Sequence, residues 1–413
     1  MSMNIPFSPP HIDDAIIDEV VAALRSGWIT TGPRTKLFER RIAEYVGVPH
    51  VVCVNSASAG LELMLRWFGI GEGDEVIVPA YTYTASAEVV LHCGAKLVLV
   101  DVNDDLLINP ELVRKAITPR TKAIIPVDIV GLPCDYQELF DLVCDTDIKK
   151  MFQPANKHQE NLGRILILAD AAHSLGAYYH GQRTGAVADV TVFSFHAVKN
   201  LTTAEGGAIC LNLPASFYEK QGIGSESIYH ELCVKSLHGQ SKDAFAKTRA
   251  GAWRYDVMNA GYKCNMTDVA AAMGLVELSR YDTMILPRRK QIFDAYNQAF
   301  INDKRFRVPT YESSEKTSSY HVFTLRVNDF SETERDTVIQ KLADQGIATN
   351  VHFIPLPMLT VYKSLGFNIE DYPNSYRQYA CEISLPVYFD LTDEQVQEVV
   401  RALKAAVSEI RPL

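Results

Sequence analysis

The chain has 413 residues, 47% of them hydrophobic, which is enough for a sizeable core and for two domains. Its 40 Lys and Arg residues against 50 Asp and Glu residues give a formal net charge of −10, and without a basic run the chain is not expected to bind nucleic acid. The eight cysteines show no Cys-x-x-Cys spacing, so we expect reduced thiols and no metal site. Since there is no uncharged apolar run of about 18 residues and no secretion signal, we expect a soluble, cytoplasmic protein without membrane contact.

Short apolar runs alternate with helical patterns from about residue 50 to residue 213. Runs of this kind are typical of strands buried on both faces of a mostly parallel sheet. The pattern predicts a doubly wound α/β domain, and we assign residues 1–284 to it, including an N-terminal arm. The runs, in chain order, are HVVCV, DEVIVPA, AKLVLVDV, KAIIPVDIVG, RILILADAA, VTVFSF and GAICLNL.

Two later stretches depart from this pattern. Residues 144–163 are polar and aperiodic, which indicates a surface insertion. From about residue 285 the chain has the strand-like TLRVNDF, the helix-like ERDTVIQKLADQG, the strand-like IATNVHFI (347–354) and the amphipathic DEQVQEVVRALKAAVSEI. We therefore predict a small C-terminal domain over residues 285–413.

Polar side chains follow three of the predicted strands at the point where each strand ends. Open α/β sheets bind ligands at the carboxyl ends of their strands, so these side chains are candidates for chemistry. The turn NSASAG (55–60) begins a helix whose N–H groups suit a phosphate. The side chains at the ends of the other two strands are Asp170 and His173 after RILIL, and Ser194, His196 and Lys199 after VTVF.

Each of these residues has a plainer interpretation on its own. A strand-end aspartate often caps a helix, a small-residue turn often only begins one, and a single lysine is usually solvated. Their convergence at one edge favours a common ligand. Pyridoxal phosphate needs an amine for its aldehyde, a carboxylate that keeps its ring nitrogen protonated, and a phosphate pocket. The amine would come from Lys199, the carboxylate from Asp170, and the phosphate pocket from Ser194 and the turn of Ser56 to Ser58. Partial burial would favour the uncharged, nucleophilic form of the lysine.

Seven segments, in order over nearly the whole chain, resemble the DegT/DnrJ/EryC1/StrS family of sugar aminotransferases. Within this family, GWITTGP and SFHA-x-KN are most similar to the members that make UDP-4-amino-4-deoxy-L-arabinose. The segments are SGWITTGPRT (26–35), NSASAGLEL (55–63), GEGDEVIVPAYTYTAS (71–86), ITPRTKAIIPV (117–127), ADAAHSLG (169–176), FSFHAVKNLTTAEGG (193–207) and GYKCNMTDVAAAMGL (261–275).

The resemblance implies fold type I of the pyridoxal phosphate enzymes: a large mixed, mostly parallel seven-stranded sheet domain with a small C-terminal α+β domain. It also implies a homodimer with shared active sites, L-glutamate as amino donor and a nucleotide keto sugar as acceptor. The residue matches are Lys199 for the lysine that binds the cofactor's aldehyde, Asp170 for the partner of its pyridine nitrogen, His173 near its phenolic oxygen, Tyr83 for the aromatic residue that stacks on its ring, and Ala57, Ser58 and Ser194 for the phosphate-binding positions.

The resemblance suggests further contacts. Lys263 lies where many members have Asn, and it would reach the phosphate from the neighbouring subunit as a point charge. Thr30 and Thr31 would line the sugar pocket, or would only follow a helix end. The remaining expected substrate contacts are His196, His321 and His352, although a lone histidine in an apolar strand is more often a core residue.

Three positions depart from the family pattern. Ala169 and Asp128 are expected beside the substrate or the cofactor edge, and Pro357 near the nucleotide. The substitutions do not affect the residues expected to hold the cofactor. They leave the identity of the sugar and of its nucleotide open.

The expected function is transfer of an amino group from L-glutamate to C4 of a nucleotide-linked keto sugar, for surface glycan such as lipopolysaccharide or for a related product. A 3-keto sugar or a cyclitol ketone is an alternative acceptor. A non-catalytic cofactor-binding sensor is a second alternative, disfavoured by the presence of Lys199 and Asp170. A dehydrase of the same fold would carry histidine in place of Lys199, and a Rossmann dehydrogenase would need a Gly-x-Gly-x-x-Gly after a strand, which is absent.

Overall fold

A computed structural model describes residues 4–241 and 254–411. Its centre is a seven-stranded sheet with the order β1-β9-β8-β5-β4-β2-β3. β9 runs antiparallel to both of its neighbours and the other pairs are parallel, as the continuous apolar runs predict. The strands are β1 (His50–Val54), β2 (Glu75–Pro79), β3 (Lys96–Val100), β4 (Thr121–Ile124), β5 (Leu166–Asp170), β8 (Val190–Ser194) and β9 (Gly207–Leu211).

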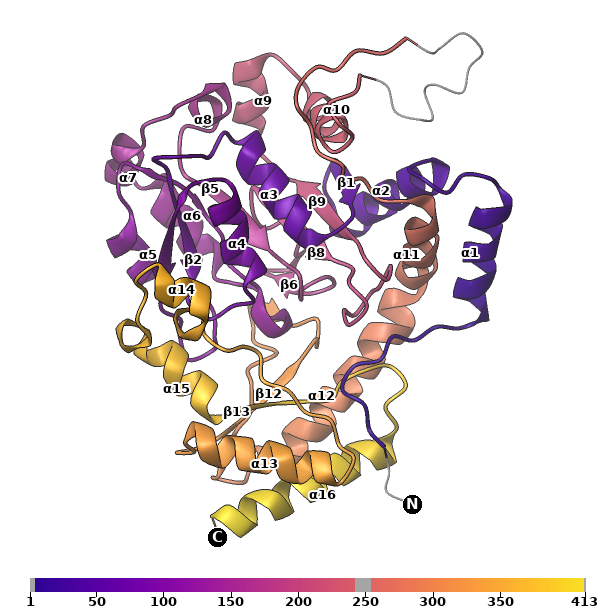
Figure 1. The fold of residues 1–413 in the computed structure, drawn as a ribbon, viewed down its shortest axis with the longest axis vertical. Coiled ribbons are helices and arrows are strands. Elements are labelled where there is room, and N and C mark those ends of the chain that lie inside the picture. The colour runs from indigo at the N-terminus through magenta and orange to yellow at the C-terminus, as the bar shows by residue number, and fades with distance from the viewer. Residues whose placement is uncertain (1–3, 242–253, 412–413) are drawn as a thin grey trace.

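Helices cover both faces of this sheet (Figure 1). Alternate residues of β1 therefore belong to different apolar clusters: Val52 and Val54 pack in one, and Val51 and Cys53 in another. The helices of the large domain are α1 (Asp14–Arg25), α2 (Pro33–Val46), α3 (Ala57–Trp67), α4 (Ala85–His92), α5 (Pro110–Ala116), α6 (Tyr136–Cys144), α7 (Thr146–Met151), α8 (Lys157–Leu162), α9 (Ala215–Gln221) and α10 (Ser225–Lys235).

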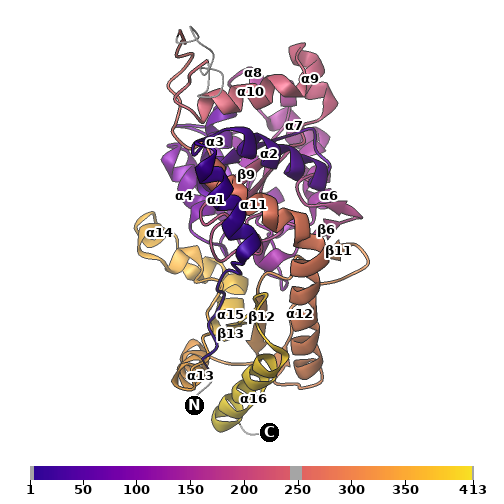
Figure 2. The same cartoon turned by 90° about the vertical axis from the view of Figure 1, so that its right-hand side faces the viewer.

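Two consecutive helices lead from the large sheet to the small domain (Figure 2). α11 (Asp268–Arg280) continues through one π turn, Tyr281–Ile285, into α12 (Leu286–Phe300). The small domain has its own apolar core and a three-stranded antiparallel sheet with the order β10-β12-β13. Its elements are β10 (Phe306–Arg307), β12 (Phe323–Val327), α13 (Glu332–Asp344), α15 (Pro373–Cys381), β13 (Glu382–Leu385) and α16 (Asp393–Ile410). α14 (Thr360–Ser364) instead packs on the core of the large domain through Tyr362.

Both ends of the described chain lie at the small domain (Figure 1). Ile5 pairs with Ile347 and is buried in the small-domain core, so the N-terminal arm joins the two parts of the molecule. A second link is a small sheet in which β11 (Lys316–Thr317) pairs with β6 (Tyr178–Tyr179), itself paired with β7 (Gln182–Arg183).

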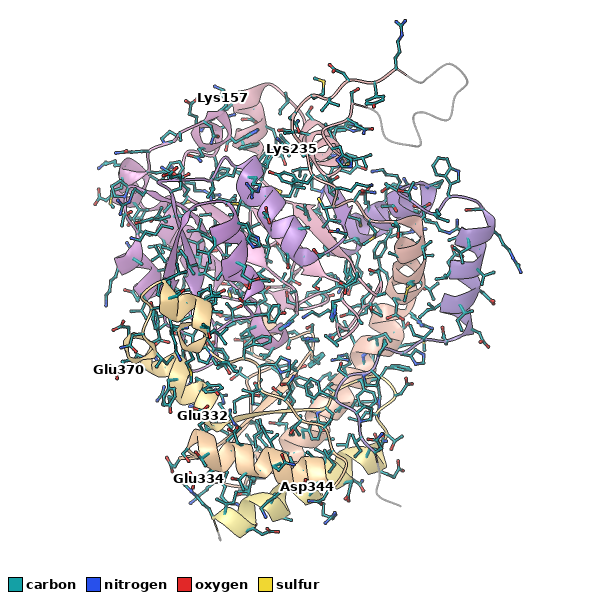
Figure 3. All side chains as sticks on the ribbon, viewed as in Figure 1. Lys157, Lys235, Glu332, Glu334, Asp344 and Glu370 are labelled. Atoms are coloured by element: carbon teal, nitrogen blue, oxygen red, sulfur yellow. The ribbon has the colours of Figure 1, made fainter. Side chains whose placement is uncertain are left out.

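Charged side chains lie on the outside of both domains (Figure 3). Lys157 and Lys235 mark the large domain in that view, and Glu332 and Glu334 lie on α13 of the small domain. Glu334 also completes a capping box with Ser331, which explains why α13 begins where it does. Within residues 4–241 and 254–411, none of the helices combines the length and the apolar character that a membrane crossing needs.

The local structure of two segments differs from their sequence pattern. Residues 144–163, which show no helical periodicity and were expected to be a surface insertion, contain α7 and α8. Their polar residues are caps and hydrogen-bond donors: Asn156 caps α8, and the side-chain amides of Asn156 and Gln159 donate to the carbonyl oxygen of Phe68 at 2.9 and 3.0 Å. Residues 347–354 form only isolated bridges, because the N–H of His352 donates to the side chain of Glu382 and not to a backbone carbonyl.

Candidate active site

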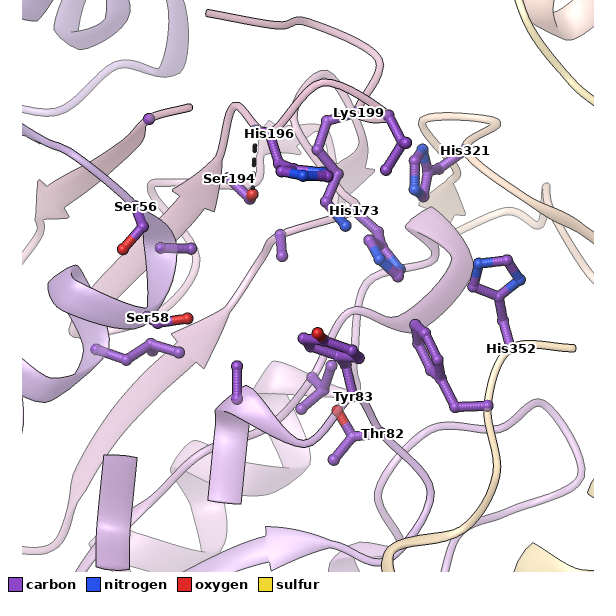
Figure 4. A pocket seen from close by; sticks show the side chains of 18 of the residues that line it. Ser56, Ser58, Thr82, Tyr83, His173, Ser194, His196, Lys199, His321 and His352 are labelled. Atoms are coloured by element: carbon purple, nitrogen blue, oxygen red, sulfur yellow. Dashed lines mark hydrogen bonds between the residues drawn. The ribbon is translucent and has the colours of Figure 1, made fainter. Parts of the chain in front are cut away.

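The carboxyl ends of β1, β5 and β8 meet at one edge of the large sheet because these strands are parallel. β9 runs the other way, so it begins at this edge. A cavity of about 370 Å³ lies there, and residues of the C-terminal part of the chain close its far side (Figure 4). The cavity is lined by Ser56, Ala57, Ser58, Tyr83, His173, Ser194, His196 and Lys199 from the large domain, and by His321, His352 and Phe353 from the later part of the chain.

Lys199 lies in the loop between β8 and β9, where its N–H donates to the carbonyl oxygen of His196 at 2.9 Å. The side chain lines the cavity. Burial lowers the pKa of Lys199 to about 8, against the opposing effect of the Asp170 carboxylate. A larger fraction of this amine than of an exposed lysine is therefore uncharged near neutral pH, as a nucleophile requires.

Asp170 is the last residue of β5 and is 5% exposed. Its carboxylate accepts hydrogen bonds from Oγ of Ser86 at 2.7 Å and from the N–H of Ala172 at 3.1 Å. Burial raises the pKa of Asp170, while these donors and the charge of Lys199 act in the opposite direction. The end of β5 thus holds the carboxylate of Asp170 in a fixed orientation beside the cavity.

The N-terminus of α3 forms another wall of the cavity. Ser56 caps the helix by accepting a hydrogen bond from the N–H of Ala59 at 3.1 Å, and Ser58 lies in the first turn. The backbone of Gly207 passes so close that a Cβ there would lie 2.7 Å from the backbone nitrogen of Ala57. Helix N–H groups at the edge of a cavity are suited to an anion such as phosphate.

Two histidines with tilted rings lie in contact at the other end of the cavity. The ring centroids of His173 and His321 are 4.3 Å apart. The N–H of Val130 donates to Nδ1 of His173 at 3.2 Å, and Nδ1 of His321 lies 2.7 Å from Oδ1 of Asn200. Burial lowers the pKa of both histidines well below the usual value, and the charge of Lys199 acts in the same direction. Both rings are therefore neutral hydrogen-bonding groups.

The mouth of the cavity carries Tyr83 and His196. Tyr83 is 59% exposed, and its ring centroid lies 5.6 Å from that of Phe353. His196 lies 3.5 Å from Glu205 in an exposed pair, and its N–H donates to Oγ of Ser194 at 3.4 Å, the dashed line in Figure 4. An exposed aromatic ring at a cavity mouth is available to stack on a flat ligand.

The family model for the DegT/DnrJ/EryC1/StrS aminotransferases matches residues 10–404. The chain belongs to this family. The sugar aminotransferase Spr1654 from Streptococcus pneumoniae, solved in its PMP-form, is 47% identical with a TM-score of 0.93, and the match covers 98% of this chain and 100% of that one. Its PLP-form is 46% identical, with the same TM-score, over 99% of this chain and 100% of that one.

Two further relatives match along nearly their full length. Protein MJ1066 of Methanocaldococcus jannaschii is 38% identical over 411 residues, 98% of each chain. The spore coat polysaccharide biosynthesis protein SpsC of Bacillus subtilis is 35% identical over 408 residues, 98% of this chain and 97% of that one. This chain is a pyridoxal phosphate-dependent sugar aminotransferase of fold type I.

The residues around the cavity fit the cofactor of this aminotransferase. Lys199 provides an amine with a lowered pKa, and Asp170 provides a buried carboxyl. The N-terminus of α3 lines the cavity, and β9 packs so closely on it at Gly207 that no side chain fits between them. These are the three groups that pyridoxal phosphate requires. Among the residues that the structure describes, no group of His, Cys, Asp and Glu side chains could hold a metal ion.

The structure brings most of the expected site residues together. Asp170 lies two residues before Ala172, which lines the cavity, but is not itself a lining residue. Thr30, Thr31 and Lys263 do not line this cavity either. The carbonyl oxygen of Thr30 accepts from the N–H of Asp268, and Oγ1 of Thr31 donates to the carbonyl oxygen of Met266. In this single chain, both threonines tie the N-terminal arm to the start of α11.

Lys263 lines a neighbouring cavity and donates from Nζ to Oδ1 of Asn265 at 2.6 Å. Ser56 and Ser58 border both cavities, so Lys263 lies on the outer side of the turn that begins α3. Its expected contact with the phosphate of a neighbouring subunit remains a prediction.

Ala169 and Asp128 were expected beside the substrate or the cofactor edge. Both side chains are fully buried, and neither lines the cavity. Asp128 accepts hydrogen bonds from the N–H of Cys134 at 2.9 Å, the hydroxyl of Tyr136 at 2.8 Å and Oγ of Ser174 at 2.7 Å. Asp128 therefore stabilises the loop after β4 from behind the site.

Several site residues were not identified from the sequence. Ser86 orients Asp170 from a position 84 residues away, and no local pattern indicates that contact. Phe353 and Glu205 line the cavity but have no distinctive spacing. Gly207 could have been found, because a Gly-Gly pair that opens a strand often marks a close backbone approach.

Proposed function

We propose that this aminotransferase transfers an amino group from L-glutamate to C4 of a nucleotide-linked keto deoxysugar. The observation that supports it best is the composition of the cavity. Three imidazoles with lowered pKa values, His173, His321 and His352, lie around the amine of Lys199. Neutral rings that donate and accept hydrogen bonds suit the hydroxyl and carbonyl groups of a sugar. Glutamate as donor and a nucleotide as carrier follow from the family resemblance.

Each residue has a defined task in this reaction. Bound pyridoxal phosphate supplies a carbonyl that combines with amines and a ring that withdraws electrons from the neighbouring carbon. Nζ of Lys199 takes the proton from the α-carbon of the amino donor and, in the second half of the reaction, gives a proton to the carbon that receives the amino group, for which a pKa of about 8 suits neutral pH. Asp170 holds its carboxylate towards the cofactor site through the hydrogen bonds from Ser86 and Ala172. The first turn of α3 binds the phosphate.

The product is proposed to enter a surface glycan. SpsC is a spore coat polysaccharide biosynthesis protein, and its similarity extends over 98% of this chain. Lipopolysaccharide is one glycan of this kind. The eight cysteines form no disulfide, which supports the reducing environment of the cytoplasm as the site of action.

The proposed assembly is a homodimer with shared active sites. Exposed apolar side chains lie on the N-terminal arm and helix, such as Ile12, Ile17 and Ile29, and in the segment that precedes Lys263, such as Val257 and Met258. Groups of exposed apolar residues favour a protein interface. Lys263 follows directly after the second group, which supports its proposed role at the neighbouring site.

The alternative acceptors are a 3-keto sugar and a cyclitol ketone. Both present the same hydroxyl and carbonyl groups, so the lining of the cavity does not separate them from a 4-keto sugar. The non-catalytic sensor has less support, because Lys199 and Asp170 are both present and oriented for chemistry.

A two-stage absorbance experiment tests the proposed function. The purified protein is loaded with pyridoxal phosphate, L-glutamate is added, and the enzyme is then offered UDP-, dTDP- and GDP-linked 3-keto and 4-keto sugars and a cyclitol ketone. We expect glutamate to bleach the visible band of the loaded enzyme and one 4-keto sugar to restore it. The proposal would be refuted if glutamate left the band unchanged, or if only a 3-keto sugar or a cyclitol ketone restored it.

A further inference from the structure

A hydrogen-bonded line of three side chains leads from the cavity into the small domain. His352 lines the cavity, and its Nδ1 lies 2.8 Å from Oγ of Ser384. The same Oγ lies 2.6 Å from Oε1 of Glu382. Because Nδ1 is engaged with Ser384, Nε2 is the ring nitrogen that a ligand in the cavity can reach. Figure 4 shows the ring of His352 at the same end of the site as those of His173 and His321.

The line follows from the register of one strand pairing. Asn350 lies opposite Ser384 in an antiparallel bridge, with N–H to oxygen distances of 3.2 and 2.8 Å. Side chains alternate along extended chains, so the residues two positions on, His352 and Glu382, share the face of Ser384. The N–H of His352 donates to Oε2 of Glu382 at 3.0 Å, which fixes the carboxyl in this position.

Glu382 has no role in the proposed function described so far, although it is a buried ionisable group. Its exposed fraction is 0%, and burial raises its pKa to about 8. Burial of a carboxyl costs free energy unless the group is paired or protonated. A buried glutamic acid at the end of a hydrogen-bonded line from the cavity is therefore a candidate functional group.

We propose that Glu382, Ser384 and His352 form a proton-transfer path between a buried carboxyl and the oxygen of the keto substrate. This inference rests on the proposed function, because it assumes a ketone in the cavity. The ketone oxygen leaves as water when the amino group is introduced, so this oxygen must be protonated during the reaction. His352 is the group that touches substrate, and Ser384 and Glu382 act through it.

The transfer balances over one complete reaction. In the half that releases water, Nε2 of His352 gives its proton to the substrate oxygen, Nδ1 receives one from Ser384, and Ser384 receives one from Glu382, which becomes ionised. The release of the oxo product of the amino donor consumes water, and a proton from that water returns along the same line. The path therefore has no net gain or loss of protons over the complete reaction.

The ionisable groups that face this line come from every element around it. Lys199, His173 and His321 face His352 across the cavity. Burial lowers the pKa of His352 to about 3, so this ring does not hold a stable positive charge and passes a proton on only as it receives one. The groups that face Glu382 are Tyr81, Arg326 on β12 and Arg335 on α13.

The position of the proton on His352 can be measured without turnover. Below pH 8 the protonated Glu382 donates to Ser384, which donates to Nδ1, so the ring proton lies on Nε2. Above pH 8 the carboxylate accepts from Ser384, which accepts from Nδ1–H. The full-length holoenzyme is labelled with ¹⁵N at its histidine ring nitrogens. The signal of His352 is assigned as the one that is absent from the spectrum of His352→Gln.

We expect the nitrogen spectrum of His352 to show a tautomer change near pH 8. This change should be absent from Ser384→Ala and Glu382→Gln and present in Ser384→Thr, which keeps the hydroxyl. An infrared band from a protonated carboxyl should be present in the wild type at pH 7 and lost in Glu382→Gln. A His352 signal that does not change with pH, or an unchanged carboxyl band in Glu382→Gln, would overturn the path.

Kinetics give a second test of the same path. Ser384→Ala should lower kcat for amination of the keto sugar about 100-fold with little change in KM, as for loss of acid–base assistance. Ser384→Thr should restore most of the rate. Ser375→Ala is the matched control, because Ser375 is a buried serine on α15 that donates to a carboxylate, Oδ1 of Asp101, at 2.6 Å and lies outside the cavity. Its kcat should stay close to that of the wild type.

The outcomes separate the two proposals. If no keto sugar is aminated by the wild type, the proposed function fails, whereas the spectra still decide whether the proton path exists. If the wild type is active and Ser384→Ala has the same kcat as Ser375→Ala, the path is refuted and Ser384 has only a structural role. Thermal unfolding of each variant identifies any rate loss that comes from misfolding. If Ser384→Ala is misfolded, the kcat of Glu382→Gln decides whether the path exists.

Discussion

At the scale of single residues, burial has opposite effects on the two groups that carry the chemistry. It lowers the pKa of Lys199 to about 8 and raises that of Asp170, because it disfavours the charged form of each. The mutual attraction of the two charges opposes both shifts. A minor but useful fraction of the lysine is thereby uncharged at physiological pH, and the hydrogen bonds from Ser86 and Ala172 help Asp170 to remain a carboxylate.

The first prediction concerns the pH dependence of cofactor capture by Lys199. Since the amine loses its proton near pH 8, the rate at which the unloaded protein captures pyridoxal phosphate should rise as the pH increases through 8 and then level off. Stopped-flow absorbance measures this rate. A rate that rises only towards the pKa of an exposed lysine, about 10.4, would contradict the effect of burial.

The second prediction concerns Asp170→Asn. The amide keeps the shape of the side chain but cannot hold a charge beside the cofactor's ring nitrogen, so kcat should fall by about 100-fold or more while the unfolding midpoint changes little. Turnover of L-glutamate with a keto sugar and thermal unfolding measure the two effects. An active Asp170→Asn variant would show that the carboxylate only caps the strand end.

At the scale of elements, the close approach of β9 to α3 shapes the phosphate site. Gly207 begins β9, and a Cβ there would lie 2.7 Å from backbone atoms of Ser56 and Ala57. Backbone atoms at the start of a capped helix cannot move aside as the end of a flexible side chain can. The strand and the helix N-terminus are therefore held at a distance that only glycine allows.

The third prediction follows from this contact. Gly207→Ala should displace the first turn of α3 and weaken the binding of pyridoxal phosphate by about 10-fold or more, since several N–H groups lose their alignment with the phosphate. Equilibrium titration of the unloaded protein measures the affinity. Gly224→Ala is the matched control, because nothing lies within 4 Å of its Cβ position. Equal affinities in the two variants would exclude α3 as the phosphate cradle.

At the scale of the whole molecule, the site depends on both domains. The large domain supplies Lys199, Asp170 and the turn before α3, while His321, His352 and Phe353 come from the later part of the chain. Arg289 of α12 donates to the carbonyl oxygens of Tyr320 and His321 at 2.9 and 2.6 Å and so positions this segment. The division at residues 284 and 285 remains a prediction, and the N-terminal Ile5 packs in the core of the small domain.

The fourth prediction tests shared active sites by mixing subunits. If Lys263 serves the neighbouring subunit, Lys199→Ala and Lys263→Glu homodimers should each be impaired. A mixture reassembled from both should contain hybrid dimers with one intact site, and about a quarter of all sites should then be active. Aminotransferase activity before and after exchange measures this. No gain on mixing would indicate that Lys263 acts within its own chain or not at the site.

The sequence alone was sufficient for the fold and for the residues at the carboxyl ends of the strands. Lys199, Asp170, Ser58 and Ser194 follow apolar runs whose length and texture predict a parallel sheet, and parallel strands bring such ends to one edge whatever their order. The family resemblance carries the same residues and adds Tyr83 and the histidines. Apart from Asp170, which lies beside the lining residue Ala172, these residues line the cavity.

Only the tertiary structure decided which distant side chains meet. The contact of Ser86 with Asp170, the approach of Gly207 to α3 and the line from His352 to Glu382 depend on sheet order and strand register. Local patterns do not encode these, because a pattern reports which face of an element is apolar and not what packs against it. The same limit explains why Asp128 was expected at the cavity and lies buried behind it.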